Sequence, residues 1–436
     1  MRSTQEILVA AKQAGNVIKS YTPAQLDAAL TAMADALIAD TNAILEANEQ
    51  DLEAARGRIS DVMLDRLRLD AKRVQGMAQG ILDVVSLPSP LGHVLAEFER
   101  PNGMTVRKIS SAMGVIAIIY ESRPNVTSDA AALAIKAGSV CVLRPGRDAA
   151  KSAAAIVAAL RKGLADAGLC QDLVNLVEDT SRQSATDLMK ANGYVDMLIP
   201  RGGAGLIRSC IENATVPCIQ TGTGICHIYV DKSADLAMAL DILDNAKTSR
   251  PSVCNACEVC LVHRDVAEQF LPMVKTRLVD ARRDAGKIPV ELRGDAFVCD
   301  IIDATPAGDN DFDTEFLDYI LALGIVDGVD EAVDHIGKHS TGHSEAIMAT
   351  DQAAIDTFVR GVDSSSVYVN VSTRFTDGGE FGFGCEMGIS TQKLHARGPM
   401  GLCEQANRVV YVAAKIAHPH WRVSFLMAMS VAKHGK

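Results

Sequence analysis

Hydrophobic positions divide the chain into an N-terminal helical part and two later blocks in which apolar runs alternate with helical patterns. From Ser3 to about Val85 the apolar residues recur with helical spacing, which predicts one layer of helices. The segment 87–92 breaks this pattern, and residues 94–109 predict a β-hairpin that turns at Pro101-Asn102-Gly103. Because an isolated two-stranded ribbon has few neighbours, we expect it to pack on another subunit.

Short runs of Val, Ile and Leu then alternate with helical segments. We predict strands at Val115–Tyr120, Val140–Leu143, Leu173–Val177 and Val195–Ile199, separated by helices at Thr127–Ala137, Ala149–Ala167 and Arg182–Ala191. Strands that alternate with helices in this way indicate a parallel sheet covered on both faces. The block therefore predicts a doubly wound, Rossmann-type domain.

A second alternating block runs from His227 to about Met400, with strands expected near 228–230, 259–262, 319–326, 346–349 and 367–370. The glycine-rich stretch 376–388 is too long for a turn and too poor in apolar residues for a core, so we expect it to line a site. The run 409–416 predicts a last strand, followed by a tail with the only tryptophan, Trp421. We expect a cofactor-binding domain at 1–92 and 113–225, an α/β catalytic domain at 226–400, and oligomerisation elements at 93–112 and 401–436.

Composition narrows the class of protein. The chain has 436 residues, 48% of them apolar, which suffices for two or three cores. A net charge of −11 without any Lys/Arg-rich block argues against nucleic-acid binding. No run of about eighteen apolar residues and no signal-peptide pattern occurs, so we expect neither a membrane span nor secretion. Eleven cysteines without framework spacing suit a reducing compartment, which predicts a cytoplasmic protein.

The segment from Arg250 to His263 holds the best candidate for a nucleophile. Cys254 lies between small polar residues just before the apolar run 259–262, at a strand edge that substrate could reach. The alternative is a packing residue, since free cysteine is commonly buried. Cys254, Cys257 and Cys260 form overlapping C-x-x-C pairs, but zinc normally takes four ligands and no second pair lies nearby. We expect no metal, and we interpret Cys257 and Cys260 as packing residues.

Two features suggest a phosphate-bearing cofactor. The loop at Arg201, Gly202 and Gly203 follows a strand and opens a helix, so its backbone N–H groups could hold a phosphate. A tight turn is the alternative for this loop. The strand 140–143 ends in Arg144-Pro-Gly-Arg147, and guanidinium groups at that end of a parallel strand suit a monoester phosphate, which favours NADP over NAD. A solvated basic turn is the alternative for Arg144 and Arg147.

Longer motifs are distributed over nearly the whole chain. They are YESRPNVT at 120–127, IPRGG at 199–203, CHIYVD at 226–231, NAK at 245–247, VCNA at 253–256, STRFTDG at 372–378 and GISTQKLHARGPMG at 388–401. Through them the chain resembles the gamma-glutamyl phosphate reductase family, also called glutamate-5-semialdehyde dehydrogenases, of the aldehyde dehydrogenase superfamily. The resemblance extends to about residue 410. Residues 144–147 depart from the Arg-Gly-Gly-Lys expected there, and the tail after Ala417 has no counterpart.

The resemblance implies an aldehyde dehydrogenase-like fold and a reaction. That reaction is the NADPH-dependent reduction of L-glutamyl 5-phosphate to L-glutamate 5-semialdehyde plus phosphate, in proline biosynthesis. Cys254 is expected to displace the phosphate and form a thioester, which is then reduced. Its backbone N–H and the Asn125 amide are expected to stabilise the oxyanion; the alternative for Asn125 is a role in fixing the turn at Pro124.

Further residues are assigned through the same resemblance. Glu315 matches the glutamate that binds the nicotinamide ribose hydroxyls, with a solvated surface charge as the alternative. The segment 221–224 lacks the general-base glutamate of hydrolytic aldehyde dehydrogenases, and none is needed when phosphate is the exchanging group. Guanidinium and hydroxyl groups beside glycines are nominated for the substrate anions: Arg374, Ser390, Thr391 and Arg397. Arg374 or Arg397 is equally suited to a structural ion pair.

The resemblance also implies a homodimer or an assembly of dimers, with glutamate 5-kinase as a candidate partner. Two other functions stay open. One is that of another thioester-forming, CoA-acylating aldehyde dehydrogenase, which the phosphate dependence of the reaction would distinguish. The other is that of a non-catalytic relative that binds the upstream kinase, which a turnover assay would distinguish.

Overall fold

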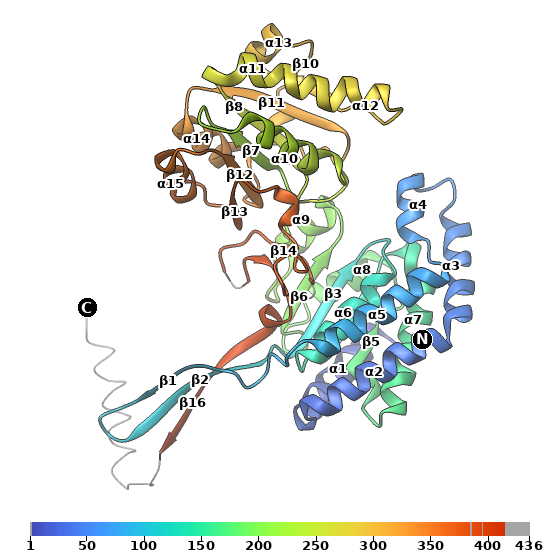
Figure 1. The fold of residues 1–436 in the computed structure, drawn as a ribbon. Coiled ribbons are helices and arrows are strands. Elements are labelled where there is room, and N and C mark those ends of the chain that lie inside the picture. Colours follow the sequence, from blue (N-terminus) through green and yellow to red (C-terminus); the bar gives the residue numbers. More distant parts are fainter. Residues whose placement is uncertain (1, 384–385, 395, 415–436) are drawn as a thin grey trace.

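The computed structural model describes residues 2–383, 386–394 and 396–414, which form two α/β units and a projecting ribbon (Figure 1). The N-terminal layer consists of α1 (Thr4–Val17), α2 (Pro23–Ala39), α3 (Thr41–Ala55), α4 (Asp61–Leu67) and α5 (Ala71–Ser86). Capping boxes begin two of these helices, with Ser3 and Glu6 at α1 and Thr22 and Gln25 at α2. Within the described residues no single helix is long and apolar enough to cross a membrane; α2 and α3 together, bent by 66°, pass that test by length and composition only.

The first unit contains a four-stranded parallel sheet in the order β5-β4-β3-β6. Its strands are β3 (Val115–Tyr120), β4 (Val140–Pro145), β5 (Val174–Leu176) and β6 (Met197–Arg201), and its helices are α6 (Asn125–Lys136), α7 (Ala150–Asp166), α8 (Arg182–Met189) and α9 (Ala204–Asn213). Every residue of β3 and β4 is buried. The N-terminal layer packs closely on this unit: at Gly163 of α7 a Cβ would lie 2.5 Å from the Met33 Cα of α2. The predicted doubly wound block is confirmed.

The second unit contains a seven-stranded parallel sheet in the order β10-β9-β11-β8-β7-β12-β13. Its strands are β7 (Cys226–Val230), β8 (Cys257–His263), β9 (Glu291–Gly294), β10 (Thr305–Pro306), β11 (Ile320–Val326), β12 (Ser344–Met348) and β13 (Ser366–Val369). Its helices are α10 (Leu236–Thr248), α11 (Arg264–Lys275), α12 (Ala281–Asp284), α13 (Ala296–Ile301), α14 (Val329–His339) and α15 (Gln352–Gly361). Two apolar clusters cover the faces, one with Phe270 and the other with Phe358. The five predicted strands are confirmed, while β9 and β10 were not predicted.

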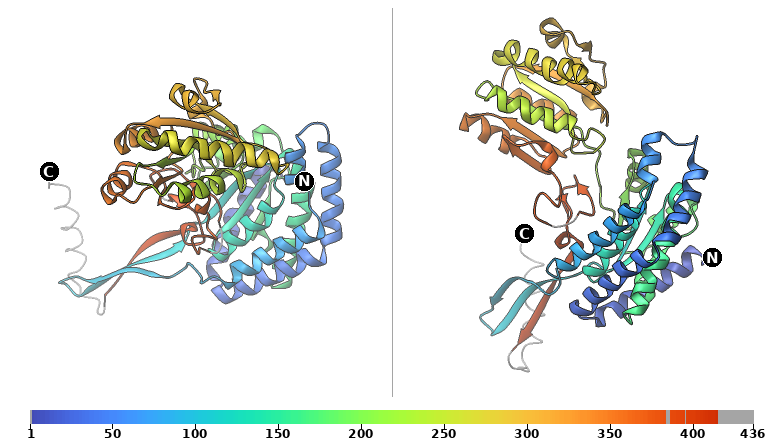
Figure 2. Two further views of the ribbon diagram at one scale, coloured as in Figure 1. Left: turned by 45° about the horizontal axis from the view of Figure 1, so that its top comes forward. Right: turned by 45° about the vertical axis from the view of Figure 1, so that its right-hand side comes forward.

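The ribbon is an antiparallel sheet of β1 (Val94–Glu99), β2 (Met104–Ala112) and β16 (Ala406–Ala414), in the order β1-β2-β16. The hairpin prediction is confirmed, and both views of Figure 2 show the ribbon extending away from the two units. On β1 the apolar side chains of Val94, Leu95 and Phe98 are about half exposed. The expected strand at 409–416 begins earlier, at Ala406; its last two residues and the tail with Trp421 lie outside the described residues.

The segment 387–402 returns the chain from the seven-stranded sheet to the first unit. Met387 and Met400 pack in the apolar core of that unit, and the short antiparallel strands β14 (Ile389–Ser390) and β15 (Gly398–Pro399) lie between them. Ser390 forms a β-bridge with Thr221, which belongs to the other segment that joins the two units. The two connections therefore run side by side, and the candidate site lies beside them.

Candidate active site

Cys254 lies in the loop between α10 and β8, and distant parts of the chain hold this loop. Four successive carbonyl groups, those of residues 252 to 255, each accept a hydrogen bond. The donors are, in that order, Arg66 Nη2, the Ala256 backbone N–H, the Cys226 thiol and the Thr373 hydroxyl, at 2.9, 3.1, 3.2 and 2.8 Å. Because every one of these carbonyls has a donor, the backbone that carries the Cys254 side chain is constrained on both sides.

Gly224 brings the connection between the units into direct contact with this loop. A Cβ at Gly224 would overlap the Cys254 carbonyl, so only glycine fits there. The Gly224 N–H donates a hydrogen bond of 2.7 Å to Oε1 of Glu315, which is 91 positions away in the sequence. The segment 221–224 thus lacks a carboxylate in sequence, as described above, but has that of Glu315 as a neighbour in the fold.

The surroundings of the Cys254 thiol keep it protonated at neutral pH. Burial raises the pKa of Cys254 to about 11; the carboxylates of Glu386 and Glu315 also raise it, and the Arg201 guanidinium lowers it. Glu386 was not among the predicted site residues. Its Oε2 accepts a hydrogen bond of 3.1 Å from the Gly378 N–H, and burial raises the pKa of Glu386 as well. Formation of the reactive thiolate therefore requires a change in this environment.

The guanidinium of Arg201 lies close enough to the Cys254 thiol to lower its pKa. Its Nη1 would be 2.7 Å from a Cβ at Gly388, a glycine with a φ of 155°, so the guanidinium contacts the 386–390 backbone. Gly203, at the start of α9, donates its N–H to Glu121 Oε2 at 2.8 Å, and a Cβ at Gly202 would lie 2.5 Å from the same oxygen. In this structure a carboxylate thus occupies the helix N-terminus at which a phosphate was expected.

A cavity of about 400 Å³ lies at the carboxyl ends of β3 and β4. Arg144, Arg147 and Arg182 line it together with Glu121 and Ser122, and Ile59 and Met63 approach from the N-terminal layer. Arg144 is buried, and its Nη2 donates to the backbone oxygens of Thr180 and Ser181 at 2.7 and 2.8 Å. Arg144 therefore supports the cavity wall. Arg147 and the unpredicted Arg182 are exposed, and their guanidinium groups make no hydrogen bond or ion pair to the described part of the chain.

Asn125 is the first residue of α6, and its Nδ2 donates to Asp129 Oδ2 at 2.9 Å. Burial raises the pKa of Asp129 to about 6, and the Arg201 guanidinium opposes that shift. Arg201 therefore acts on both Asp129 and Cys254, which brings the α6 N-terminus into the surroundings of the thiol. Between the described residues no hydrogen bond joins Asn125 to the Cys254 loop.

Five arginines surround the Cys254 loop, and we call them the arginine cluster: Arg66, Arg123, Arg201, Arg250 and Arg374. Arg374 donates through Nε to Ser249 Oγ at 3.2 Å and through Nη1 to Asn255 Oδ1. Burial lowers the pKa of Arg123 to about 10; Arg201, Arg66 and Arg250 lower it further, and Cys254 opposes them.

Sequence reasoning placed Arg374 at the substrate and Arg201 at the cofactor, and it missed the other three members of the cluster. Arg123 lies within the YESRPNVT motif and Arg250 opens the Cys254 segment, so both could have been found. Arg66 gave no such signal.

The other residues nominated for substrate anions separate into two places. Ser390 is buried on β14, and the Thr391 hydroxyl would be 2.7 Å from a Cβ at Gly222, so both lie at the 221–224 segment. Arg397 instead donates to Asp363 Oδ1 at 3.0 Å, and Lys393 pairs with the same carboxylate. For Arg397 the structure therefore shows the ion pair that was its alternative. Cys257 and Cys260 are fully buried in β8.

Comparisons with known proteins agree in one family. The model of the aldehyde dehydrogenase family matches residues 3–288. The gamma-glutamyl phosphate reductase of Streptococcus sanguinis is 56% identical over 93% of this chain and 96% of its own length, and that of Neisseria meningitidis serogroup B is 57% identical over the same shares. Among solved structures, the gamma-glutamyl phosphate reductase of Thermotoga maritima superposes with a TM-score of 0.92 at 42% identity, covering 96% of this chain and 100% of that one.

Proposed function

The chain belongs to the gamma-glutamyl phosphate reductases of the aldehyde dehydrogenase family, and we propose that it reduces L-glutamyl 5-phosphate to L-glutamate 5-semialdehyde, with release of phosphate, in proline biosynthesis. The observation that carries this proposal is the arginine cluster around the Cys254 thiol. An acyl phosphate of glutamate brings a phosphate and a carboxylate, and guanidinium groups match both in charge and in hydrogen-bond geometry. A neutral aldehyde would need no such cluster.

Cys254 is the proposed nucleophile. Its thiolate attacks the acyl carbon, the C–O bond to phosphate breaks, and a thioester remains on the enzyme. The Cys254 backbone N–H and the Asn125 amide are the proposed donors to the oxyanion that develops during this attack. After reduction, the thiohemiacetal releases the aldehyde and regenerates the Cys254 thiolate.

Arg66, Arg123, Arg250 and Arg374 are the proposed ligands of the substrate anions, with Ser390 and Thr391 at the adjoining segment. A cation close to the thiol also favours the thiolate, which is the role we propose for Arg201. The prediction that the loop 201–203 binds a cofactor phosphate is weakened, because the Gly203 N–H already donates to the Glu121 carboxylate. Arg397 is left out, because the Asp363 carboxylate already neutralises its charge, whereas the described hydrogen-bond partners of Arg66 and Arg374 are uncharged.

The cavity at β3 and β4 fits the nicotinamide cofactor that the family implies. Its position at the carboxyl ends of parallel strands is the usual place for a dinucleotide, and Arg147 and Arg182 are available to a phosphate. We propose that the cofactor is NADPH, with its 2'-phosphate at Arg147 and Arg182 and with Arg144 supporting the wall. Glu315 remains the proposed ligand of the ribose hydroxyls, since only its Oε1 is engaged by the described residues. When bound, the cofactor supplies the hydride that reduces the thioester.

We further propose that the ribbon joins a second copy of the chain. The outer edge of β1 is unpaired in the described residues, and its apolar side chains are half exposed. Pairing across a two-fold axis would cover both. Sedimentation should show a dimer or an assembly of dimers, and a stable, active monomer at micromolar concentration would contradict it. Glutamate 5-kinase, which makes the proposed substrate, is the candidate partner, and the cytoplasm is the proposed location.

The reaction is most easily tested in reverse. Purified protein is mixed with glutamate 5-semialdehyde, NADP and phosphate, and the absorbance of the reduced nicotinamide is followed. We expect turnover that requires phosphate. Turnover that requires CoA instead would identify a CoA-acylating enzyme, and the absence of turnover with either acceptor would identify a non-catalytic relative.

A further inference from the structure

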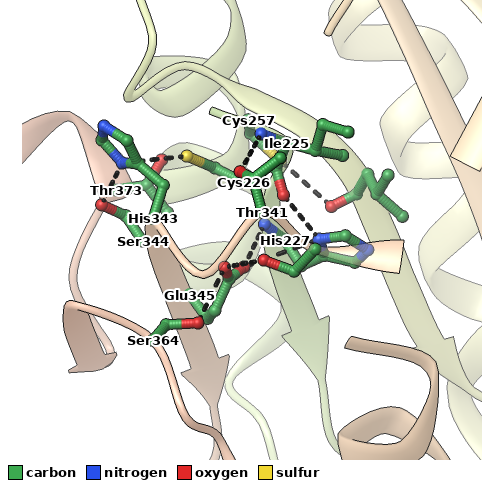
Figure 3. A network of polar contacts seen from close by, with 12 residues as sticks. Ile225, Cys226, His227, Cys257, Thr341, His343, Ser344, Glu345, Ser364 and Thr373 are labelled. Carbon is green, nitrogen blue, oxygen red and sulfur yellow. Dashed lines mark hydrogen bonds and ion pairs between the residues drawn. The ribbon is translucent and has the colours of Figure 1, made fainter. Parts of the chain in front are cut away.

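Cys226 has no part in the proposed reaction, yet its side chain contacts the backbone of the proposed nucleophile. It is fully buried at the start of β7, and its Sγ lies 3.2 Å from the Cys254 carbonyl oxygen. On its other side, Sγ lies 3.7 Å from Nδ1 of His343 (Figure 3). Burial raises the pKa of Cys226 well above the ordinary range, so the group stays a neutral thiol and does not compete with Cys254 as a nucleophile.

His343 determines the direction of the Cys226 hydrogen bond. Burial lowers the pKa of His343 to about 4, so at physiological pH the ring is neutral and carries one N–H. Its Nε2 is buried without a partner among the described residues, whereas Nδ1 lies 2.8 Å from Ser344 Oγ. A buried N–H without an acceptor costs more than an unused lone pair, so the proton belongs on Nδ1. The S–H of Cys226 then has the Cys254 carbonyl as its acceptor.

The hydrogen bonds continue from His343 back to the catalytic loop. Ser344 Oγ lies 2.6 Å from Thr376 Oγ1, and the Thr376 backbone oxygen accepts a hydrogen bond of 2.9 Å from Asn255 Nδ2. These contacts form a path from the Cys254 carbonyl to the Asn255 side chain, in which the link between Cys226 Sγ and the His343 ring is a packing contact, because the Nδ1–H donates to Ser344. Cys226 begins β7, His343 and Ser344 lie at the start of β12, and Thr376 follows β13.

We infer that Cys226 is a positioning residue for Cys254: its thiol holds the peptide between Cys254 and Asn255 and so sets the direction in which the nucleophile leaves the backbone. The inference rests on the proposed function, because it takes Cys254 as the nucleophile. Misplacing a reacting group by 1 Å can cost on the order of a hundredfold in rate, so a weak hydrogen bond at this peptide has a large effect on catalysis. The competing role for Cys226 is packing alone, as for Cys260.

Three variants separate the two roles. Cys226→Ala removes the donor and leaves a small cavity, Cys226→Ser keeps a donor, and Cys260→Ala makes a matched cavity on β8, where Cys260 lies opposite Ile228 of β7. For Cys226→Ala we expect kcat to fall about tenfold, and alkylation of Cys254 by iodoacetamide, followed on its peptide by mass spectrometry, to slow similarly. Its melting temperature and NADPH affinity should match those of Cys260→Ala. Cys226→Ser should keep kcat within about threefold of wild type.

Several outcomes would overturn the inference. Wild-type kcat and alkylation rate in Cys226→Ala would do so, as would equal losses in Cys260→Ala. If Cys226→Ala does not fold, Cys226→Val replaces it, and equal activity of the Val and Ser variants would count against a donor. Cys254→Ala separates this test from the proposed function. If Cys254→Ala is active, Cys254 is not the nucleophile and the proposed mechanism fails. If Cys254→Ala is inactive while Cys226→Ala is fully active, only the positioning role of Cys226 is refuted.

Discussion

The two parallel sheets carry their polar groups in different places. In the four-stranded sheet, β3 and β4 are apolar over most of their length, and the charged groups gather at the strand ends, where Arg147 and Arg182 border a cavity. In the seven-stranded sheet, His227, Glu258 and Glu345 are fully buried within strands. The first arrangement suits a ligand that binds and leaves, because the groups that meet it stay solvated. The second suits a loop that must not move, because buried polar groups allow few alternative conformations.

Among the described residues, both buried carboxylates of the catalytic sheet have partners, and those of Glu345 are the His227 N–H and the hydroxyls of Ser340 and Ser364. The Lys247 ammonium lies 2.6 Å from Glu258 Oε2, with both side chains fully buried. Glu258 Oε1 also accepts a hydrogen bond of 3.1 Å from the Leu317 N–H, and Leu317 has a φ of 55°. A left-handed leucine is strained unless its surroundings hold it, and this one lies two residues from Glu315. The ion pair therefore also supports the carboxylate beside the nucleophile.

The largest effect is expected from removing the Cys254 thiol, which lies beside the seven-stranded sheet. Cys254→Ala is expected to lower kcat by at least about a hundredfold, because the covalent step loses its nucleophile. Fold and cofactor affinity should be retained, since alanine keeps the backbone contacts of the loop. Cys257→Ala and Cys260→Ala, which alter buried cysteines of β8, should stay active in the same assay. A Cys254→Ala protein with more than about a hundredth of wild-type kcat would refute the assignment.

Lys247→Met tests whether the buried charges of the catalytic sheet depend on one another. The variant leaves Glu258 buried without its cation, and breaking such a pair costs about 3–5 kcal/mol of unfolding free energy. Urea unfolding measures this loss. Burial raises the pKa of Glu258 to about 7 although Lys247 lowers it, so removing the cation should raise this pKa further. The folded state of the variant then binds the extra proton, and stability should fall as pH rises from the unfolded value through the folded pKa.

The exposed pair Arg56–Glu49 provides the control for that experiment. Arg56→Ala should change the unfolding free energy by less than about 1 kcal/mol, because solvent screens the pair. If Lys247→Met lowered the unfolding free energy by as little as Arg56→Ala, water or another group would have replaced the lost cation. The buried charges would then not distinguish the seven-stranded sheet from the four-stranded one.

The role of the four-stranded sheet in cofactor binding is tested by reversing charge at the cavity beside β3 and β4. Arg147→Glu is expected to weaken NADPH about tenfold and NADH much less, because only NADPH carries the extra phosphate. Arg182→Glu should do the same. Arg144→Glu should instead weaken both cofactors, since it releases the carbonyls of Thr180 and Ser181. Equal losses for the two cofactors in Arg147→Glu would place the 2'-phosphate elsewhere.

The fold was largely predictable because long apolar runs with regular spacing leave few alternatives. The run 115–120 became β3, and 259–262 lies within β8. The strands β9 and β10 have only four and two residues, with the sequences ELRG and TP. Their pattern carries no strand signal, and they are extended because β11 pairs with β9 and β9 with β10. Tertiary context decides such elements.

The site was predictable only where its residues are close in sequence or share a motif. Arg374, within STRFTDG, does contact the nucleophile loop through Asn255. Arg66 reaches Ser252 across 186 positions, and nothing in the pattern of α4 distinguishes it from a solvated charge. For Arg144 the residue type suggested a phosphate, but its partners are backbone carbonyls whose position depends on a loop conformation that the sequence does not reveal.

The smallest predicted effect concerns the charges at the thiol. Glu386 raises the pKa of Cys254 and Arg201 lowers it, with burial as the larger cause. Glu386→Gln removes a negative charge, so the pKa of Cys254 should fall and more thiolate should be present at a given pH. A fall of half a unit would speed alkylation by iodoacetamide about threefold, because the thiolate fraction scales with it below the pKa.

Arg201→Met gives the opposite sign and so sharpens this test. Removing the cation should raise the pKa of Cys254 and slow alkylation over the same pH range. Glu380→Gln changes an exposed glutamate of the same stretch and should leave the rate unaltered. Measured without substrate from about pH 7 to 9, the three rates should rank Glu386→Gln first, Glu380→Gln with wild type, and Arg201→Met last. An unchanged alkylation rate in both Glu386→Gln and Arg201→Met would mean that burial alone sets the pKa of Cys254. The charged groups beside the seven-stranded sheet would then have no effect on the nucleophile.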